Sequence, residues 1–309
     1  VRKDGKPGGL SPATIQKYHH ILSSMFAYAV DNLHELDENP CASVKPPKIP
    51  KRKPVSLEKD PAIKVLRALA DEALKWKVIT LIAACTGMRR GECLGIEDTT
   101  IDLQNCVIKI ENASRHRPGA EIRMKDPKSD KSIRAIPFPS SIVPLIEELI
   151  AYRDEKREKL EDKWVDKVLK DGEWVDNHLL FIQWNGKPMH PNSVDEWWKK
   201  FREANNLPQN LTFHGLRHTN ITMLLKAGVD IGTVADNAGH AKKSTTLDYD
   251  DPSAEALREV ATKMNDILEL KDTVAELVGK PVNKGRKKGW KRGYKKKSCP
   301  QNCPSPDDK

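Results

Sequence analysis

The stretch from Thr212 to Tyr249 constrains the fold of this chain most, because it brings two imidazoles, a guanidinium and a phenol toward one place. The pattern of apolar residues predicts a helix from Leu216 to Lys226, and the Ala227-Gly228 step ends it. A second short helix is predicted to end near Gly239. Two helices joined by a short turn therefore surround a single position in space.

The four side chains form a coherent chemical set. His214 and Arg217 are three residues apart, so they share one face of a helix. His240 follows Ala238-Gly239, and Tyr249 comes nine residues after His240. A guanidinium can grip a phosphate with two N–H groups, an imidazole can move protons, and a phenol can attack phosphorus. The set therefore suits phosphoryl transfer.

At these residues the sequence resembles the tyrosine recombinases of the phage integrase family, in particular the integrases of conjugative transposons and prophages. Five pieces in the family's order carry the resemblance: Thr86-Gly87-Met88-Arg89-Arg90-Gly91-Glu92, Pro127-Lys128-Ser129 with Arg134-Ala135-Ile136-Pro137, His214-Gly215-Leu216-Arg217, Ala238-Gly239-His240 and Thr245-Thr246-Leu247-Asp248-Tyr249. Each piece alone occurs in unrelated proteins, whereas the ordered set is specific.

The resemblance implies a mainly α fold with a small antiparallel β-sheet (α+β), made of a catalytic domain and a helical core-binding segment. We expect the end of the core-binding domain and a linker over 1–50, the catalytic domain over 51–278, and a basic tail over 279–309. The chain is expected to start partway through the core-binding domain, without an arm-binding domain before it.

The implied function is site-specific recombination that integrates or excises a mobile element. Family members cut and rejoin double-stranded DNA at attachment sites without a metal or other cofactor, through a 3′-phosphotyrosyl intermediate. A homotetramer on DNA, an excisionase or host DNA-bending factor as helper, and a location at the bacterial nucleoid in the cytoplasm follow from the same resemblance.

The resemblance also assigns catalytic roles to six residues. Arg89 and Arg217 hold the phosphate, and Lys128 protonates the departing 5′-oxygen. Tyr249 is the nucleophile, His214 accepts its proton, and His240 binds the phosphate.

Three of these assignments have alternatives. Lys125 competes with Lys128 for the hairpin position, and an alignment shifted by one residue would put Asp250 where the nucleophile belongs. Arg89 could instead form a structural salt bridge with Glu92 or Asp98. We expect Glu92 to support the site from behind, since a carboxylate repels a phosphate.

Composition agrees with a polyanionic partner. The 309 residues hold 53 Lys and Arg against 44 Asp and Glu, a net charge of +9. The residues expected to contact DNA are Lys48, Lys51, Arg52 and Lys53 with the Lys45-Pro46 step in the Pro-rich linker, Lys125 and Lys131 in the hairpin, and Lys242 and Lys243 after His240.

Other compositional features exclude several classes of protein. No apolar run approaches the roughly 20 residues that span a bilayer, and no secretory signal opens the chain, so we expect a soluble intracellular protein. The six cysteines form no metal-binding pattern, and those at 41, 85, 93 and 106 are expected in the core.

Hydrophobic periodicity predicts the remaining elements. Helices are expected over 10–36, 62–72, 76–86, 90–94, 140–170, 193–205 and 253–277, and strands around 107–110, 133–138 and 179–182 separated by a polar loop over 112–131. Trp197, Trp198 and Phe201 are expected in the core. The last helix packs either on a neighbouring subunit or on its own domain.

Two other functions fit parts of the pattern. A type IB topoisomerase-like enzyme would use the same chemistry as a monomer that relaxes DNA, and an integrase-derived DNA-binding protein would have lost catalysis altogether. Trapping of a covalent DNA–protein adduct distinguishes a catalytic from a non-catalytic protein.

Overall fold

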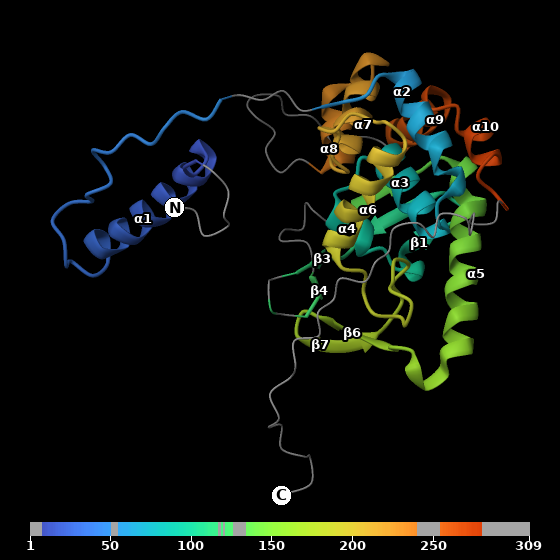
Figure 1. The fold of residues 1–309 in the computed structure, drawn as a ribbon, viewed down its shortest axis with the longest axis horizontal. Helices are drawn as coiled ribbons and strands as arrows, with labels where there is room; N and C mark the ends of the chain where they lie inside the picture. Colours follow the sequence, from blue (N-terminus) through green and yellow to red (C-terminus); the bar gives the residue numbers. More distant parts are fainter. Residues whose placement is uncertain are drawn as a thin grey trace, which may run out of the picture. The chain divides into compact units, whose positions relative to one another are not determined.

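The structure is a computed structural model that describes residues 8–50, 55–116, 119, 121–125, 134–239 and 254–279. The chain divides into two compact units, Val1–Pro54 and Val55–Lys309 (Figure 1). Among the described residues, no helix combines the length and the apolarity needed to cross a bilayer.

Over the described residues 8–50, the first unit is built on the helix α1 (Pro12–Asp31). Its start follows the prediction: the Ser11 hydroxyl accepts a hydrogen bond from the Thr14 N–H at 3.2 Å. The predicted end near residue 36 was wrong, because the chain leaves the helix at Asn32 and reverses direction. The Asn39 side chain then donates to the Ser23 carbonyl at 2.9 Å and holds the returning chain against α1.

The second unit is organised around α3 (Leu74–Thr86), whose residues from Lys77 to Thr86 are all buried. It packs against α5 (Val143–Leu160) and α7 (Gly215–Lys226). The buried helix confirms the prediction, although it begins earlier than expected. It ends at Gly87, where two features require glycine. The φ of Gly87 is 67°, and a Cβ on this residue would lie only 2.7 Å from Oδ1 of Asn220.

The other helices surround this core (Figure 1). In chain order they are α2 (Lys59–Arg67) with a 3₁₀ turn at Ala68–Asp71, α4 (Arg90–Leu94), α6 (Pro191–Ala204), α8 (Ile231–Ala238), α9 (Ala254–Ile267) and α10 (Leu270–Ala275). Trp198 and Phe201 of α6 are buried and Trp197 packs against the core, as predicted.

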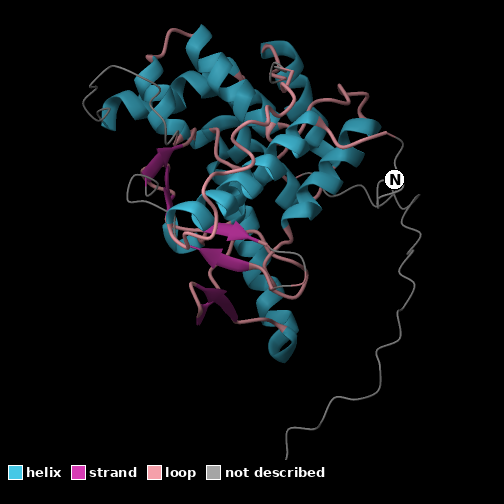
Figure 2. Cartoon of the chain, turned by 90° about the vertical axis from the view of Figure 1, so that its left-hand side faces the viewer, coloured by secondary structure: helices cyan, strands magenta, loops and turns pink. Residues whose placement is uncertain are grey.

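The strands of the described residues form two small sheets, which Figure 2 shows beside the helices. One sheet is antiparallel, with the order β1 (Ile101–Asp102), β2 (Val107–Ile110) and β5 (Arg134–Pro137). The other joins β3 (Ala113–Arg115), β4 (Arg123–Lys125), β6 (Lys167–Lys170) and β7 (Glu173–Asp176), with β4 and β6 parallel. The mainly α fold with small sheets is confirmed, and one of the sheets is mixed.

Two strand predictions were wrong. The polar segment over 112–131 is not only a loop, since β3 and β4 lie within it. Residues 179–182 form no strand and make only the isolated bridges Glu97↔Leu179 and Ile182↔Pro188. Their apolar run reflects burial rather than pairing, because Leu179, Leu180 and Phe181 are all buried.

Two helix predictions were too long. The helix predicted over 140–170 ends at Leu160, and β6 and β7 follow as a hairpin whose turn residues Asp171 and Gly172 have positive φ. The predicted C-terminal helix is two helices, broken where Glu269 adopts a φ of 49°. That break lets both Leu268 and Leu270 enter the core of their own unit.

Candidate active site

The site is built around the C-terminal end of α3, whose last carbonyls are held by side chains from α7 and α8. The Asn220 amide donates to the Ala84 and Cys85 carbonyls at 3.0 and 2.8 Å. The Asn237 amide donates to the Thr86 carbonyl at 3.2 Å. The last carbonyls of a helix have no partners within it, so these bonds fix α7 and α8 to the end of α3.

Arg217 of α7 completes this arrangement. It is buried, and its Nη1 donates to the Gly87 carbonyl at 2.7 Å. Its buried Nη2 has no hydrogen-bond partner among the described residues. Burial, assisted by the positive charge of Arg89, lowers the pKa of Arg217 to about 10. A buried cation with an unpartnered N–H edge is prepared to receive an anion.

Arg89 lies between α3 and α4, close enough to Arg217 for its charge to act on that residue. Its backbone N–H donates to Glu92 Oε2 at 2.9 Å, and its Nη1 donates to Glu92 Oε1 at 2.7 Å. Its Nη2 reaches across to the Gly239 carbonyl at 2.5 Å. The salt bridge to Glu92 that we considered as an alternative is therefore present, yet 43% of the Arg89 side chain remains exposed.

Glu92 is the carboxylate that gathers these cations. Burial alone would raise its pKa, but the positive charge of Arg134 and hydrogen bonds from Arg89 and Arg134 outweigh burial and lower the pKa below its usual value. Glu92 therefore stays ionised. Arg89 and Arg134 contact Glu92, and the charge of Glu92 also acts on the nearby Arg217. Three guanidiniums against one carboxylate leave an excess of positive charge.

His214 stands at the start of α7, one turn before Arg217. Burial first, and then the nearby His218 and Arg217, lower its pKa from 6.5, so the imidazole is neutral at pH 7 and can accept a proton. The rings of His214 and His218 meet edge to face with centroids 5.0 Å apart.

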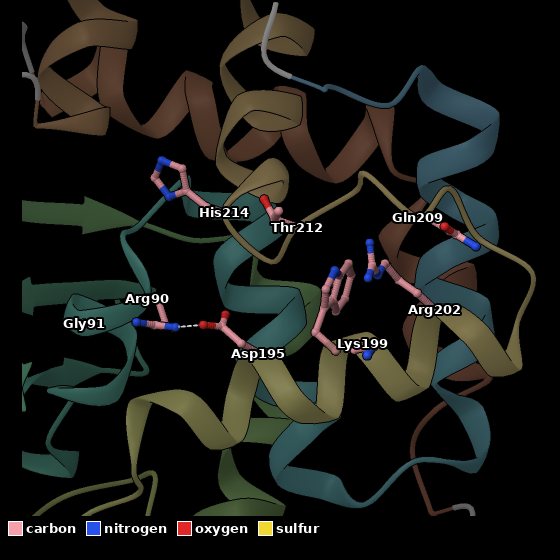
Figure 3. A pocket seen from close by; sticks show the side chains of 9 residues that line it. Arg90, Gly91, Asp195, Lys199, Arg202, Gln209, Thr212 and His214 are labelled. Atoms are coloured by element: carbon pink, nitrogen blue, oxygen red, sulfur yellow. Dashed lines mark hydrogen bonds and ion pairs between the residues drawn. The ribbon is translucent and has the colours of Figure 1, made fainter. Parts of the chain in front are cut away.

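His214 also lines an open groove of about 650 Å³ between α4, α6 and α7 (Figure 3). Arg90 and Asp195 form an ion pair across this groove, and Lys199 and Arg202 project from α6 along it. The groove therefore continues the positive character of the site away from the three arginines.

We did not assign a role to Arg134 from the sequence. Its side chain is only 12% exposed and binds Glu92 together with the Asn237 and Ala238 carbonyls at the end of α8. One signal was available: strand periodicity puts Arg134 on the same face as the buried Ile136, and a charge on a buried face needs partners. Asn220 and Asn237 carried no comparable signal.

The structure thus brings Arg89, His214 and Arg217 together. Lys128, Lys131, His240, Lys242, Lys243 and Tyr249, as well as Lys51, Arg52 and Lys53 of the linker, lie outside the described residues. Lys125 belongs to β4, and its side chain is not among those described. In the first unit, Lys45 and Lys48 are exposed, and Pro46 between them is half-buried.

Residues 56–256 match the phage integrase family. The chain is 31% identical over 256 residues to a tyrosine recombinase XerC-like protein of Caldanaerobacter subterraneus, over 77% of this chain but only 62% of that protein. It is 24% identical over 270 residues to the ICEBs1 integrase of Bacillus subtilis, covering 86% and 69% of the two chains.

A solved structure supports the same assignment of the fold. The Tn1549 transposon integrase in complex with transposon right end DNA matches with a TM-score of 0.64 at 22% identity, over 81% of this chain and 79% of the other. The match to the family covers most of the second unit, including the elements that carry Arg89, His214 and Arg217. The chain belongs to the phage integrase family.

Proposed function

We propose that this chain is a site-specific tyrosine recombinase that cuts and rejoins double-stranded DNA, and so integrates or excises a mobile element. The observation that carries this proposal is the unpartnered Nη2 of the buried Arg217, beside the half-exposed Arg89 and the neutral His214. Relatives named as recombinases and integrases, and a solved integrase structure with DNA, support it.

The electrostatics suit a phosphodiester. Each diester carries one negative charge, and more charge collects on its non-bridging oxygens as a nucleophile adds to phosphorus. Three arginines and one glutamate leave an excess of positive charge. This charge stabilises the transition state more than the ground state, because the transition state carries more negative charge on those oxygens. In this proposal Arg217 and Arg89 bind the two non-bridging oxygens, and His240 adds a hydrogen bond.

The covalent step uses a tyrosine. The Tyr249 oxygen attacks phosphorus and its proton passes to His214, whose lowered pKa leaves it free to accept a proton at pH 7. The bond from phosphorus to the 5′-oxygen breaks, and Lys128 protonates that oxygen. The product is a 3′-phosphotyrosyl bond that a second DNA 5′-hydroxyl reverses, so rejoining needs no external energy source.

Further roles extend the same proposal. Lys45 and Lys48 with the linker residues Lys51, Arg52 and Lys53, and Lys125, Lys131, Lys242 and Lys243 in the second unit, contribute phosphate contacts. We place a homotetramer on the two attachment sites, assisted by an excisionase or a host DNA-bending factor. Its place of work is then the bacterial cytoplasm, at the nucleoid. Residues 1–50, 51–278 and 279–309 act as core-binding segment, catalytic domain and basic tail.

A nicked suicide substrate tests the proposal, because the short 5′-fragment diffuses away and traps the covalent intermediate. The wild-type chain is expected to form a DNA adduct, and Tyr249→Phe to form none while binding DNA as before. Tyr152→Phe is the matched control, since Tyr152 is an exposed residue of α5. DNA binding without any adduct from the wild-type chain would indicate a non-catalytic binding protein instead.

A further inference from the structure

The C-terminal turn of α8 is held by two arginines, Arg134 of β5 and Arg89 immediately before α4. The Gly239 N–H closes the helix on the Ala235 and Asp236 carbonyls. The next three carbonyls point to guanidiniums: those of Asn237 and Ala238 accept from Arg134 at 3.3 Å each, and that of Gly239 accepts from Arg89 at 2.5 Å. Cations at this end of a helix also complement its dipole.

The N–H groups of Arg134 are committed to protein partners. Its Nε donates to the Asn237 carbonyl, its Nη2 to the Ala238 carbonyl and, at 3.1 Å, to Glu92 Oε2, and its Nη1 lies 3.5 Å from Glu92 Oε1. The side chain is 12% exposed, compared with 43% for Arg89. Arg134 is therefore placed to hold protein groups rather than to bind a phosphate.

Gly239 fits directly against this guanidinium. Its φ is 66°, and a Cβ at this position would lie 2.5 Å from Arg134 Cζ. A side chain at 239 would thus meet both backbone strain and a clash. The close packing fixes the backbone immediately before His240.

Arg134 also connects segments that are remote in sequence. It begins β5, where it pairs with Ile110 of β2, and its other partners are Glu92 of α4 and the end of α8. Glu92 in turn holds both the backbone and the side chain of Arg89. One guanidinium therefore sets the end of α8 relative to the residue that faces the phosphate.

We propose that Arg134 is a positioning residue for DNA cleavage, which anchors the end of α8 to Glu92 so that the chain enters His240 and the nucleophile segment from a fixed point. This inference rests on the proposed recombinase function. Loss of the anchor displaces catalytic groups without removing any of them, and a displacement of about 1 Å can lower a rate by about 10²-fold.

The test compares Arg134→Ala and Arg134→Lys with Arg153→Ala. Arg153 of α5 is a matched control, because its side chain is 10% exposed and is paired with Asp98 and Asp154 outside the site. Single-turnover cleavage of the suicide substrate at saturating protein is measured beside DNA affinity. Hydrogen exchange of the 231–239 peptide reports on α8 itself.

For Arg134→Ala, we expect about 10²-fold slower cleavage at saturation, an affinity for DNA within about threefold of wild type, and faster amide exchange in α8. Added guanidinium ion should restore cleavage by at least about tenfold, whereas equal sodium chloride should not. Arg134→Lys should retain intermediate activity, and Arg153→Ala should change neither cleavage nor exchange in α8.

Cleavage by Arg134→Ala at the wild-type rate, or unchanged exchange in α8, would overturn the proposal. Equal losses of cleavage and melting temperature in Arg134→Ala and Arg153→Ala, without rescue by guanidinium, would also overturn it, because they would indicate general destabilisation. A wild-type chain that forms no adduct contradicts the recombinase function, whereas exchange in α8 still decides whether Arg134 anchors the helix.

Discussion

Replacing Arg217 by Lys keeps the positive charge but removes one of the two donor edges that the structure gives this residue. Nη1 already serves the Gly87 carbonyl at 2.7 Å, and Nη2 is free for a phosphate oxygen. A lysine Nζ replaces two nitrogens set apart in a planar fork by a single nitrogen, so it cannot keep both hydrogen bonds in their present geometry. The variant therefore loses one charge-assisted hydrogen bond in the transition state, worth about 3 kcal/mol, so cleavage should slow by about 10²-fold.

Arg217→Met should lose still more activity without a matching loss of stability. The shift of the Arg217 pKa from 12.5 to about 10 means that the folded state disfavours the charged form by about 3 kcal/mol at neutral pH. Methionine removes that cost but leaves the Gly87 carbonyl unpaired, which costs about 1–3 kcal/mol. The two effects nearly offset each other, so the melting temperature should change little.

The assay is single-turnover cleavage of suicide DNA with saturating protein, and a thermal melt of each variant accompanies it. Arg153→Lys is the control, because Arg153 is also a buried, paired arginine but lies outside the site. Its cleavage rate should stay within about threefold of wild type. An Arg217→Lys variant that cleaves as fast as the wild-type chain would refute the assignment of Arg217 Nη2 to the phosphate.

Three other predictions follow from single features of the chain. Burial lowers the pKa of His214 below 6.5, and the imidazole can act as a base only while it is neutral. The rate of cleavage at subsaturating protein should therefore fall as the pH is lowered, with a midpoint below pH 6.5. A midpoint above pH 6.5 contradicts this role of His214. Deleting residues 280–309 removes eleven Lys and Arg. The slope of log K, the association constant for random duplex DNA, against log salt should become shallower by about 0.9 for each phosphate that the tail neutralises. An unchanged slope means that the tail serves another partner. Gly87→Ala should lower the free energy of unfolding by about 2–4 kcal/mol, because it adds strain at positive φ and a clash with Asn220. Gly228→Ala, also at positive φ but beside open space, should lower it by only about 1 kcal/mol. Equal losses of the two variants in denaturant titrations would contradict the packing argument.

Local patterns in the sequence predicted the parts of the fold that local physics determines. An almost wholly apolar run predicted the buried α3, and the Gly87 that follows it predicted its end. The hairpin of β6 and β7 was predictable too, because Asp171-Gly172 is a strong turn signal, but the charge-rich run before it favoured a longer helix. The break at Glu269 had no such signal, since neither glycine nor proline marks it, and burial of Leu268 and Leu270 determines it.

The candidate site was predictable where one short motif carries its residues. Arg89, His214 and Arg217 were found in this way, and the structure brings them together. The supporting residues were not found, because their contacts join distant segments: Arg134 meets Glu92 across 42 positions and the Asn237 carbonyl across 103. Such pairings depend on the tertiary fold, which no single stretch of the sequence encodes.

The central claim is that Tyr249 carries the DNA during recombination, and mapping the trapped adduct tests it most directly. The wild-type chain is incubated with suicide DNA, digested with nuclease and protease, and analysed by mass spectrometry. We expect one peptide, containing Tyr249, to carry a residual nucleotide 3′-phosphate on the phenolic oxygen, and Tyr249→Phe to yield none. A nucleotide attached to any other residue, or an adduct that persists in Tyr249→Phe, would contradict the role of Tyr249 as nucleophile.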